Sequence, residues 1–215
     1  MTRPRKPKRK YDSSRRQAQA RQTRAQILEA ARRLFAQKGY AGATIEAVAA
    51  QAGVAPETIF ATLGSKRSLL AALISESVTG DDQPLPLLKR PGPQAVLGDH
   101  DPRTQVRLFA EDIAVILDRV APLFEIMRAA AKTEPEIAAL LSRLLDERFR
   151  GLAAFVRSLI RHGPLRAGLN ETQATEIVWT VASPEVYGLL TIDRKWSRQR
   201  SAQWLGDTLA RLLLP

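Results

Sequence analysis

Apolar side chains recur at the spacing of an α-helix along most of the chain, and this regularity limits the possible folds more than any other feature. In residues 135–161 they line one side of a predicted long helix: Ile137, Leu141, Leu144, Leu145, Leu152, Val156, Leu159 and Ile160. No alternating apolar and polar run is long enough to predict a strand, and no internal repeat is visible. The sequence therefore predicts an all-α fold.

Capping residues divide the first part of the chain into four short helices. Gly39 stands where the first helix should end, and Thr44 and Gly53 stand at the two ends of a second helix. Pro56 suits the first turn of a third helix, and Ser65 is placed to cap a fourth. The spacing of these signals predicts a compact unit of small helices.

A second block of helices follows a segment rich in proline and glycine. Residues 80–102 contain five Pro and three Gly, which predicts a linker or loop. The helices expected beyond it cover 103–117, 122–132, 135–161, 171–192 and 197–214, with Pro184 expected to kink or split the fourth of them. We expect four regions: a disordered arm over 1–23, the small helical unit over 24–79, the linker over 80–102, and a larger helical domain over 103–215.

The positive charge is confined to one end of the chain. The sequence has 33 Lys and Arg against 22 Asp and Glu, a net charge of +11. Residues 1–70 hold 15 of the basic and 4 of the acidic side chains, so the whole excess lies there. A basic end joined to a neutral remainder predicts one module that faces nucleic acid and one with a different task.

Several classes of protein are disfavoured by composition. The chain has no Cys and two His, so we expect no disulfide, no metal and no cofactor. The longest apolar run has six residues, Leu69–Ile74, which predicts a soluble cytoplasmic protein that contacts no membrane. The triplet Asp99, His100 and Asp101 resembles a base with orienting carboxylates, but its place in the proline-rich segment favours a solvated loop, and His162 suits a helix C-terminus. We therefore expect no enzyme.

The most specific signal is the stretch from Thr44 to Lys66, which has the spacing of a helix-turn-helix. Ala49 is small where two helices would cross, Gly53 allows the turn, and Ile59 would lock the second helix against the first. That second helix would enter the major groove of DNA, and its candidates for contact with bases are Pro56, Glu57, Thr58, Ala61 and Thr62. Thr44 and Lys66 are candidates for phosphate contacts. A plain helical corner is the alternative interpretation.

Residues 24–74 resemble the DNA-binding domain of the TetR family of bacterial transcriptional regulators. The resemblance covers about a quarter of the chain and rests on Leu34, Phe35, Gly39, Tyr40, Thr44, Ile45, Val48, Ala49, Ala52, Gly53, Val54, Ile59, Phe60, Ser65, Lys66, Leu69 and Leu70. It implies a homodimer that represses transcription and a C-terminal domain whose ligand changes the separation of the two DNA-reading heads. It also adds Phe60 and Ser65 to the DNA-binding candidates.

Two departures from the family pattern affect the details of DNA contact. Phe60 stands where the family commonly has a Tyr whose hydroxyl meets a phosphate, so that contact is lost. Thr62 and Leu63 replace a common aromatic pair. The basic arm adds a further choice, because it could lie in an adjacent minor groove or act as a solvated tail that raises nonspecific affinity.

The larger domain offers candidates for a ligand cavity and a dimer interface. The cavity candidates are Phe109, Phe124, Met127, Arg128, Phe155 and Trp179, although ordinary core packing explains the apolar ones equally well. The dimer candidates implied by the resemblance are Val186, Tyr187, Leu190, Trp204, Leu205 and Leu209, which a monomer core would also explain.

The leading hypothesis is a homodimeric, ligand-responsive repressor that binds double-stranded DNA and an unknown small-molecule effector. Its two heads would read a pseudo-palindromic operator with recognition helices about 34 to 36 Å apart, or a multiple of one helical turn. One rival is a sequence-independent architectural protein that uses only its basic end. Another is an all-α enzyme with a helix-turn-helix appendage.

Overall fold

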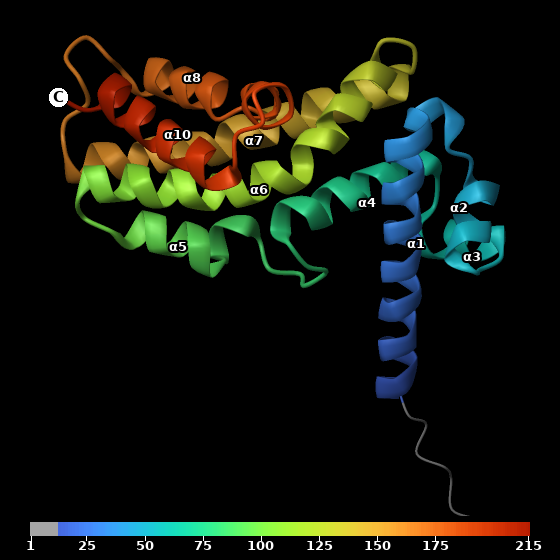
Figure 1. Ribbon diagram of the computed structural model, residues 1–215. Helices are drawn as coiled ribbons and strands as arrows, with labels where there is room; N and C mark the ends of the chain where they lie inside the picture. Colours follow the sequence, from blue (N-terminus) through green and yellow to red (C-terminus); the bar gives the residue numbers. More distant parts are fainter. Residues whose placement is uncertain (1–12) are drawn as a thin grey trace, which may run out of the picture.

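The chain folds into helices that form a small N-terminal domain and a larger C-terminal one. The computed structural model describes residues 13–215, and Figure 1 shows the two domains side by side along the long axis. Residues 13–215 are 82% helical and contain no strand, which confirms the predicted all-α class.

The N-terminal domain packs three short helices against one long one. Its elements are α1 (Ser13–Gly42), α2 (Ile45–Ala52), α3 (Pro56–Leu63) and α4 (Lys66–Thr79). Apolar residues of α1, with Ile27 and Phe35 at the centre, meet Ile59 of α3 and the leucines of α4 in a closed core. Gly39 has φ of 66°, so helical geometry breaks near the end of α1, where a helix end was predicted.

The helix α1 begins well before the expected position. Residues 13–23 are helical, so the prediction of a disordered arm over 1–23 is wrong for this part; residues 1–12 lie outside the described residues. Figure 1 shows the extension projecting from the domain. The segment is rich in Arg, Gln and Ala, which propagate a helix well, so it continues the helix that the core has already nucleated.

Two short helices occupy part of the proline-rich segment, where the sequence predicted a linker or loop over 80–102. They are η1 (Leu87–Lys89) and α5 (Pro91–Gly98). Arg90 holds the turn by pairing with Asp81 at 2.7 Å, and this contact lowers the pKa of Asp81 to about 2. The buried Val96 fixes α5 to the larger domain, where its carbonyl accepts from Gln105. Proline here starts helices instead of preventing them.

The C-terminal domain is a layered bundle around two long helices. Its elements are α6 (Pro102–Ala131), α7 (Pro135–His162), α8 (Glu171–Val181), α9 (Pro184–Gly188), η2 (Leu189–Asp193, a π-helical turn) and α10 (Arg198–Leu213). Pro184 separates α8 from α9, as predicted. The prediction of two helices over 103–132 is wrong, because α6 continues through the exposed Pro122. Figure 1 shows α6 changing direction along its length, which accommodates the proline ring.

One hydrophobic core runs across the boundary between the two domains. It joins Leu70 and Ile74 of α4 to Leu117, Phe124 and Met127 of α6. A second core lies further along the C-terminal domain, among α5, α6, α7, α8 and α10. The boundary at residue 79 therefore marks a change in architecture but not a break in packing.

Candidate nucleic-acid interface and ligand cavity

The helix-turn-helix corner has the local geometry that its sequence predicts. The Thr44 hydroxyl accepts a hydrogen bond from the Ala47 backbone N–H at 3.1 Å, which caps α2. Gly53 has φ of 69°, a left-handed conformation that glycine adopts without strain. Ala49 and Ile59 are fully buried, so the crossing of α2 and α3 is closed. The corner therefore presents α3 as a rigid unit.

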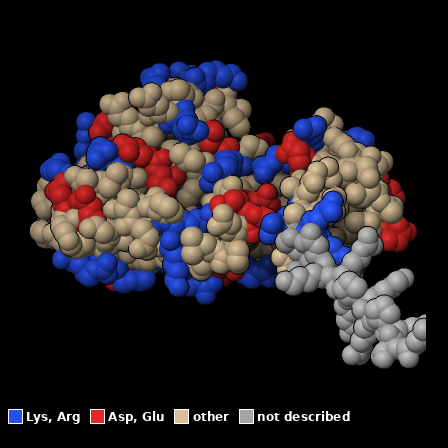
Figure 2. All heavy atoms as spheres, turned by 90° about the horizontal axis from the view of Figure 1, so that it is seen from below, with Lys and Arg blue, Asp and Glu red and all other residues tan. Residues whose placement is uncertain are grey.

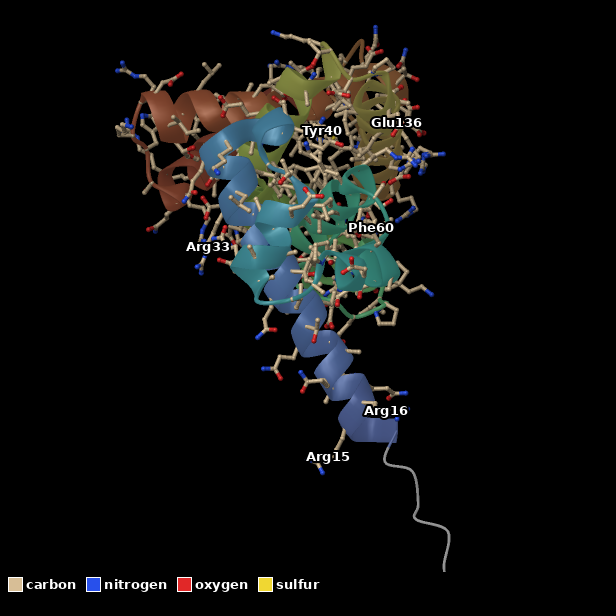
Figure 3. All side chains as sticks on the ribbon, turned by 90° about the vertical axis from the view of Figure 1, so that its right-hand side faces the viewer. Arg15, Arg16, Arg33, Tyr40, Phe60 and Glu136 are labelled. Atoms are coloured by element: carbon tan, nitrogen blue, oxygen red, sulfur yellow. The ribbon has the colours of Figure 1, made fainter. Side chains whose placement is uncertain are left out.

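The outer face of α3 combines one carboxylate with apolar groups. Glu57, Ala61 and Thr62 are exposed, Pro56 and Thr58 are half-buried, and the ring of Phe60 is 54% exposed. The Thr62 hydroxyl donates to the Thr58 carbonyl at 2.6 Å, so it is used within the helix. Figure 3 views the domain from the right-hand side of Figure 1, with Phe60 labelled.

The N-terminus of α4 brings a cation to the segment that precedes α2. Ser65 caps α4 by accepting from the Ser68 backbone N–H at 3.2 Å. Lys66 donates to the Ala41 carbonyl at 3.3 Å, and its Nζ lies 4.3 Å from the centre of the Tyr40 ring. Partial burial lowers the pKa of Lys66. Lys66 is therefore held against the C-terminal end of α1.

Charge is mixed over the rest of the surface. Figure 2 looks from below the view of Figure 1 and shows Lys, Arg, Asp and Glu interspersed over the larger domain, while uncharged side chains predominate over the N-terminal domain. Part of the basic excess noted in the sequence lies on the extension of α1, which carries Arg15, Arg16 and Arg21. The face of α3 itself is not basic.

A cavity of about 520 Å³ lies between α4, α5, α6 and α7. Three of the cavity candidates, Phe109, Phe124 and Phe155, line it, and the rings of Phe109 and Phe155 stack with their centres 4.0 Å apart. Its wall also includes Ile74 and Val78 of α4. The cavity therefore extends from the C-terminal domain to the helix that begins at Lys66.

The other three cavity candidates lie outside this cavity. Met127 is fully buried in the shared core, and Arg128 lines a separate groove at α9, where it pairs with Glu185. Trp179 is outside the lining and instead stacks against Arg148, with the guanidinium carbon 5.1 Å from the ring centre. Position in the sequence did not show which large side chains turn toward the cavity, because α6 turns different faces to the two cores.

Four charged residues line the cavity, Asp112, Glu147, Arg148 and Arg150, and the sequence predicted none of them. Arg148 donates to the carbonyls of Trp179 at 2.6 Å and Ala182 at 2.9 Å, and burial lowers its pKa to about 10. Asp112 is half-buried, and burial raises the pKa of its carboxyl against the opposing effect of Arg119. The signal was weak, since both residues occur in helices with many other charges.

The surface around α9 and η2 contains a groove of about 540 Å³ that α6 also lines. Three of the predicted dimer residues, Tyr187, Leu205 and Leu209, are buried within this chain, so they leave no surface for a partner; the Tyr187 hydroxyl donates to Asp118 at 2.7 Å. Val186, Leu190 and Trp204 are partly exposed. Leu189 and Ile192, which the sequence analysis missed, are 58% and 47% exposed in the groove.

The two histidines of the chain meet although 62 positions separate them. His100 Nδ1 lies 3.1 Å from His162 Nε2. The Asp101 carboxylate accepts from the Thr104 N–H and caps α6, while Asp99 accepts from the Asp101 N–H. The carboxylates thus shape the start of α6 instead of orienting a base. Within residues 13–215, no group of three or more His, Asp or Glu side chains has the arrangement of a metal site.

The architecture defines a helix-turn-helix protein whose DNA-reading unit is continuous with a cavity-bearing helical domain. Residues 27–73 match the family model of the bacterial regulatory proteins of the tetR family. The match covers most of the N-terminal domain, and the whole chain has the fold of TetR-family transcriptional regulators. In the described part, no helix is long and apolar enough to cross a membrane.

Solved structures support the fold along nearly the whole chain. NalD of Pseudomonas aeruginosa, the secondary repressor of the MexAB-OprM multidrug efflux pump, is 18% identical, with a TM-score of 0.67 over 92% of this chain and 98% of its own. PfmR of Thermus thermophilus, a TetR-family transcriptional regulator, is 23% identical, with a TM-score of 0.65 over 88% and 99%. FadR of Bacillus subtilis, in complex with stearoyl-CoA, is 19% identical, with a TM-score of 0.64 over 86% and 96%. No curated protein matches the sequence.

Proposed function

We propose that this protein is a homodimeric transcriptional repressor that binds a pseudo-palindromic operator and releases it when a small molecule fills the cavity. The observation that carries the proposal is that α4 both begins at the DNA-binding corner and forms part of the cavity wall. As a regulator of bacterial genes, the protein would act in the cytoplasm and would not be an enzyme.

Hydrogen bonds connect the C-terminal end of α4 to α6 and to α1. Arg119 of α6 donates to the carbonyls of Ser77 at 2.7 Å and Val78 at 3.3 Å. Arg32 of α1 donates to the Ser77 hydroxyl at 3.0 Å. A ligand that displaces Ile74 or Val78 would therefore shift both α4 and α1, which supports release of DNA through a change in the DNA-binding domain.

The lining of the cavity supports an apolar effector with an anionic end. Phenylalanine, leucine, isoleucine and valine side chains form most of the wall, and Arg148 bonds to carbonyls instead of carboxylates. Its guanidinium would attract a carboxylate or phosphate. The complex of FadR with stearoyl-CoA, a fatty-acyl thioester, agrees with this proposal.

Selection from a library of random DNA duplexes tests the proposed function. The purified protein should enrich a pseudo-palindrome, and binding to it should exceed binding to a scrambled duplex by about 10³-fold or more at physiological salt. A Lys66→Ala variant should weaken binding to both duplexes equally and flatten the dependence on log salt by about one unit. If the two duplexes bind equally and affinity falls steeply with salt, the sequence-independent architectural alternative replaces the proposal.

A further inference from the structure

The recognition helix α3 lacks the side chains that usually read purines. Its sequence from Pro56 to Leu63 contains no Arg, Lys, Asn or Gln. Thr62 uses its hydroxyl within the helix, which leaves the Thr58 hydroxyl as the side-chain donor on the outer face. In the major groove, guanine presents two acceptors, and its bidentate partners are Arg and Lys. Adenine presents an acceptor beside a donor, and its bidentate partners are Asn and Gln. The helix has no such partner to offer.

The outer face of α3 is instead equipped for pyrimidines. Glu57, Phe60 and Ala61 stand at positions i, i+3 and i+4, which share one side of a helix, and all three are exposed, whereas Ile59 is buried. Thymine carries a C5-methyl group at the floor of the major groove, and cytosine carries an amino group that donates. The ring of Phe60 and the methyl group of Ala61 suit the thymine methyl. The carboxylate of Glu57 suits the cytosine amino group.

The exposed ring of Phe60 lies on the helix that a helix-turn-helix presents to DNA. A ring that is 54% exposed on a short helix leaves apolar surface in water. The recognition helix of such a unit lies in the major groove of DNA. Thymine methyl groups are the apolar surface that the groove provides, so contact with them would remove the ring from water.

We propose that α3 reads its operator through pyrimidines: Phe60 and Ala61 contact thymine methyl groups, and Glu57 accepts from the amino group of a cytosine. This inference rests on the proposed DNA-binding function and specifies how the site is read. It also assigns a role to Phe60 in place of the phosphate contact that a Tyr would make at this position.

Single replacements of thymine by deoxyuridine in the selected operator test the methyl contacts. Deoxyuridine keeps every hydrogen-bonding group and removes only the C5-methyl. Each replacement at a contacted position should weaken binding of the unmodified protein about fourfold, the equivalent of one buried methyl-sized group. Thymines outside the half-sites provide the control and should be insensitive.

Variants of α3 assign each methyl to its reader. At one thymine of the half-site, the Phe60→Ala variant should bind the unmodified operator and its deoxyuridine replacement equally. At another thymine, the Ala61→Gly variant should lose the sensitivity in the same way. Both side chains are exposed, so Phe60→Ala should melt close to the parent protein, and Ala61→Gly should lower the Tm by no more than roughly 2 to 4 °C, the cost of glycine within a helix. The methyl contacts are overturned if deoxyuridine has no effect at any half-site position, or if both variants keep the full sensitivity.

A change of specificity tests Glu57 separately. Glu57→Gln replaces an acceptor by an amide that pairs with adenine, so a second selection should show adenine in place of cytosine at one position of each half-site. An unchanged consensus would remove Glu57 from base reading. Failure of the unmodified protein to select any sequence would instead contradict the proposed function, so the two failures are distinguishable.

Discussion

Gly53 and Gly151 both have open space where a Cβ would stand, but their backbone conformations differ. Gly53 has φ of 69° at the turn of the helix-turn-helix, and Gly151 lies in the middle of α7. Gly53→Ala should therefore destabilise the protein by about 1 kcal/mol, because a Cβ is strained in the left-handed region. Gly151→Ala should stabilise it by about 0.5 to 1 kcal/mol, because alanine favours a helix interior.

Thermal melts of the two glycine variants check this pair of predictions. At this chain length, 1 kcal/mol corresponds to a Tm shift of roughly 2 to 4 °C, so the variants should melt on opposite sides of the parent protein. Equal shifts in the same direction would show that local space, and not φ, decides the outcome.

The half-buried carboxyl of Asp112, in the cavity wall, makes the stability of the protein depend on pH. Burial raises the pKa of this carboxyl in the folded state above 3.8, its value in the unfolded chain. The protonated carboxyl therefore stabilises the fold fully below pH 3.8, and this stabilisation is lost as the pH rises through the folded pKa. At neutral pH the charged carboxylate therefore costs stability. Asp112→Asn should raise the Tm at pH 7, and the gain should shrink below about pH 4.

Melts of Asp112→Asn and of a control variant across pH 3 to 8 check this prediction. The control is Glu111→Gln, which neutralises an exposed neighbour and should change the Tm little. A lower Tm for Asp112→Asn at neutral pH would instead show that attraction to Arg119 outweighs the cost of burial.

Among the elements, the extension of α1 changes the interpretation of the basic arm. An α-helix with its side chains is about 10 Å wide, whereas the minor groove of DNA is about 6 Å wide. The helical residues 13–23 therefore do not fit that groove, and their arginines would contact phosphates along its edge. Whether a basic arm enters the minor groove or remains a solvated tail is therefore a question about residues 1–12 alone.

Neutralising the extension tests this element without altering the corner. The double variant Arg15→Gln and Arg16→Gln should reduce the slope of log affinity against log salt by nearly two units, equally for operator and scrambled DNA. A matched pair in the C-terminal domain, Arg107→Gln and Arg143→Gln, removes the same charge and should leave the slope unchanged. Loss confined to the operator would indicate base reading by the extension.

The elements also show what sequence reasoning can predict. The caps at Thr44 and Ser65 were correct because a capping hydroxyl and its N–H partner lie three residues apart in the chain. The order of α5 and the continuity of α6 through Pro122 were missed because both depend on packing with residues far away. For the same reason, Arg148 could not be assigned to the cavity before α7 and α8 were placed together.

At the scale of the whole molecule, the proposed homodimer can be tested at the exposed side chains of Leu189 and Ile192. Replacing both by Glu removes two apolar contacts from each copy and introduces four charges, so association should weaken by about 10³-fold or more. Sedimentation of the variant at micromolar concentration should give the monomer mass. Ile160→Glu, at a similarly exposed apolar site on α7, is the control and should leave the dimer intact.

The core that α4 shares with α6 also sets a limit on engineering. Leu70 and Ile74 would lose their apolar partners on α6 if residues 13–79 were cut from the rest of the chain. The DNA-reading head should therefore not survive as an isolated fragment, and heating should melt both domains in one transition. A chimaera that moves this head onto another sensor would have to carry the facing surface of α6 with it.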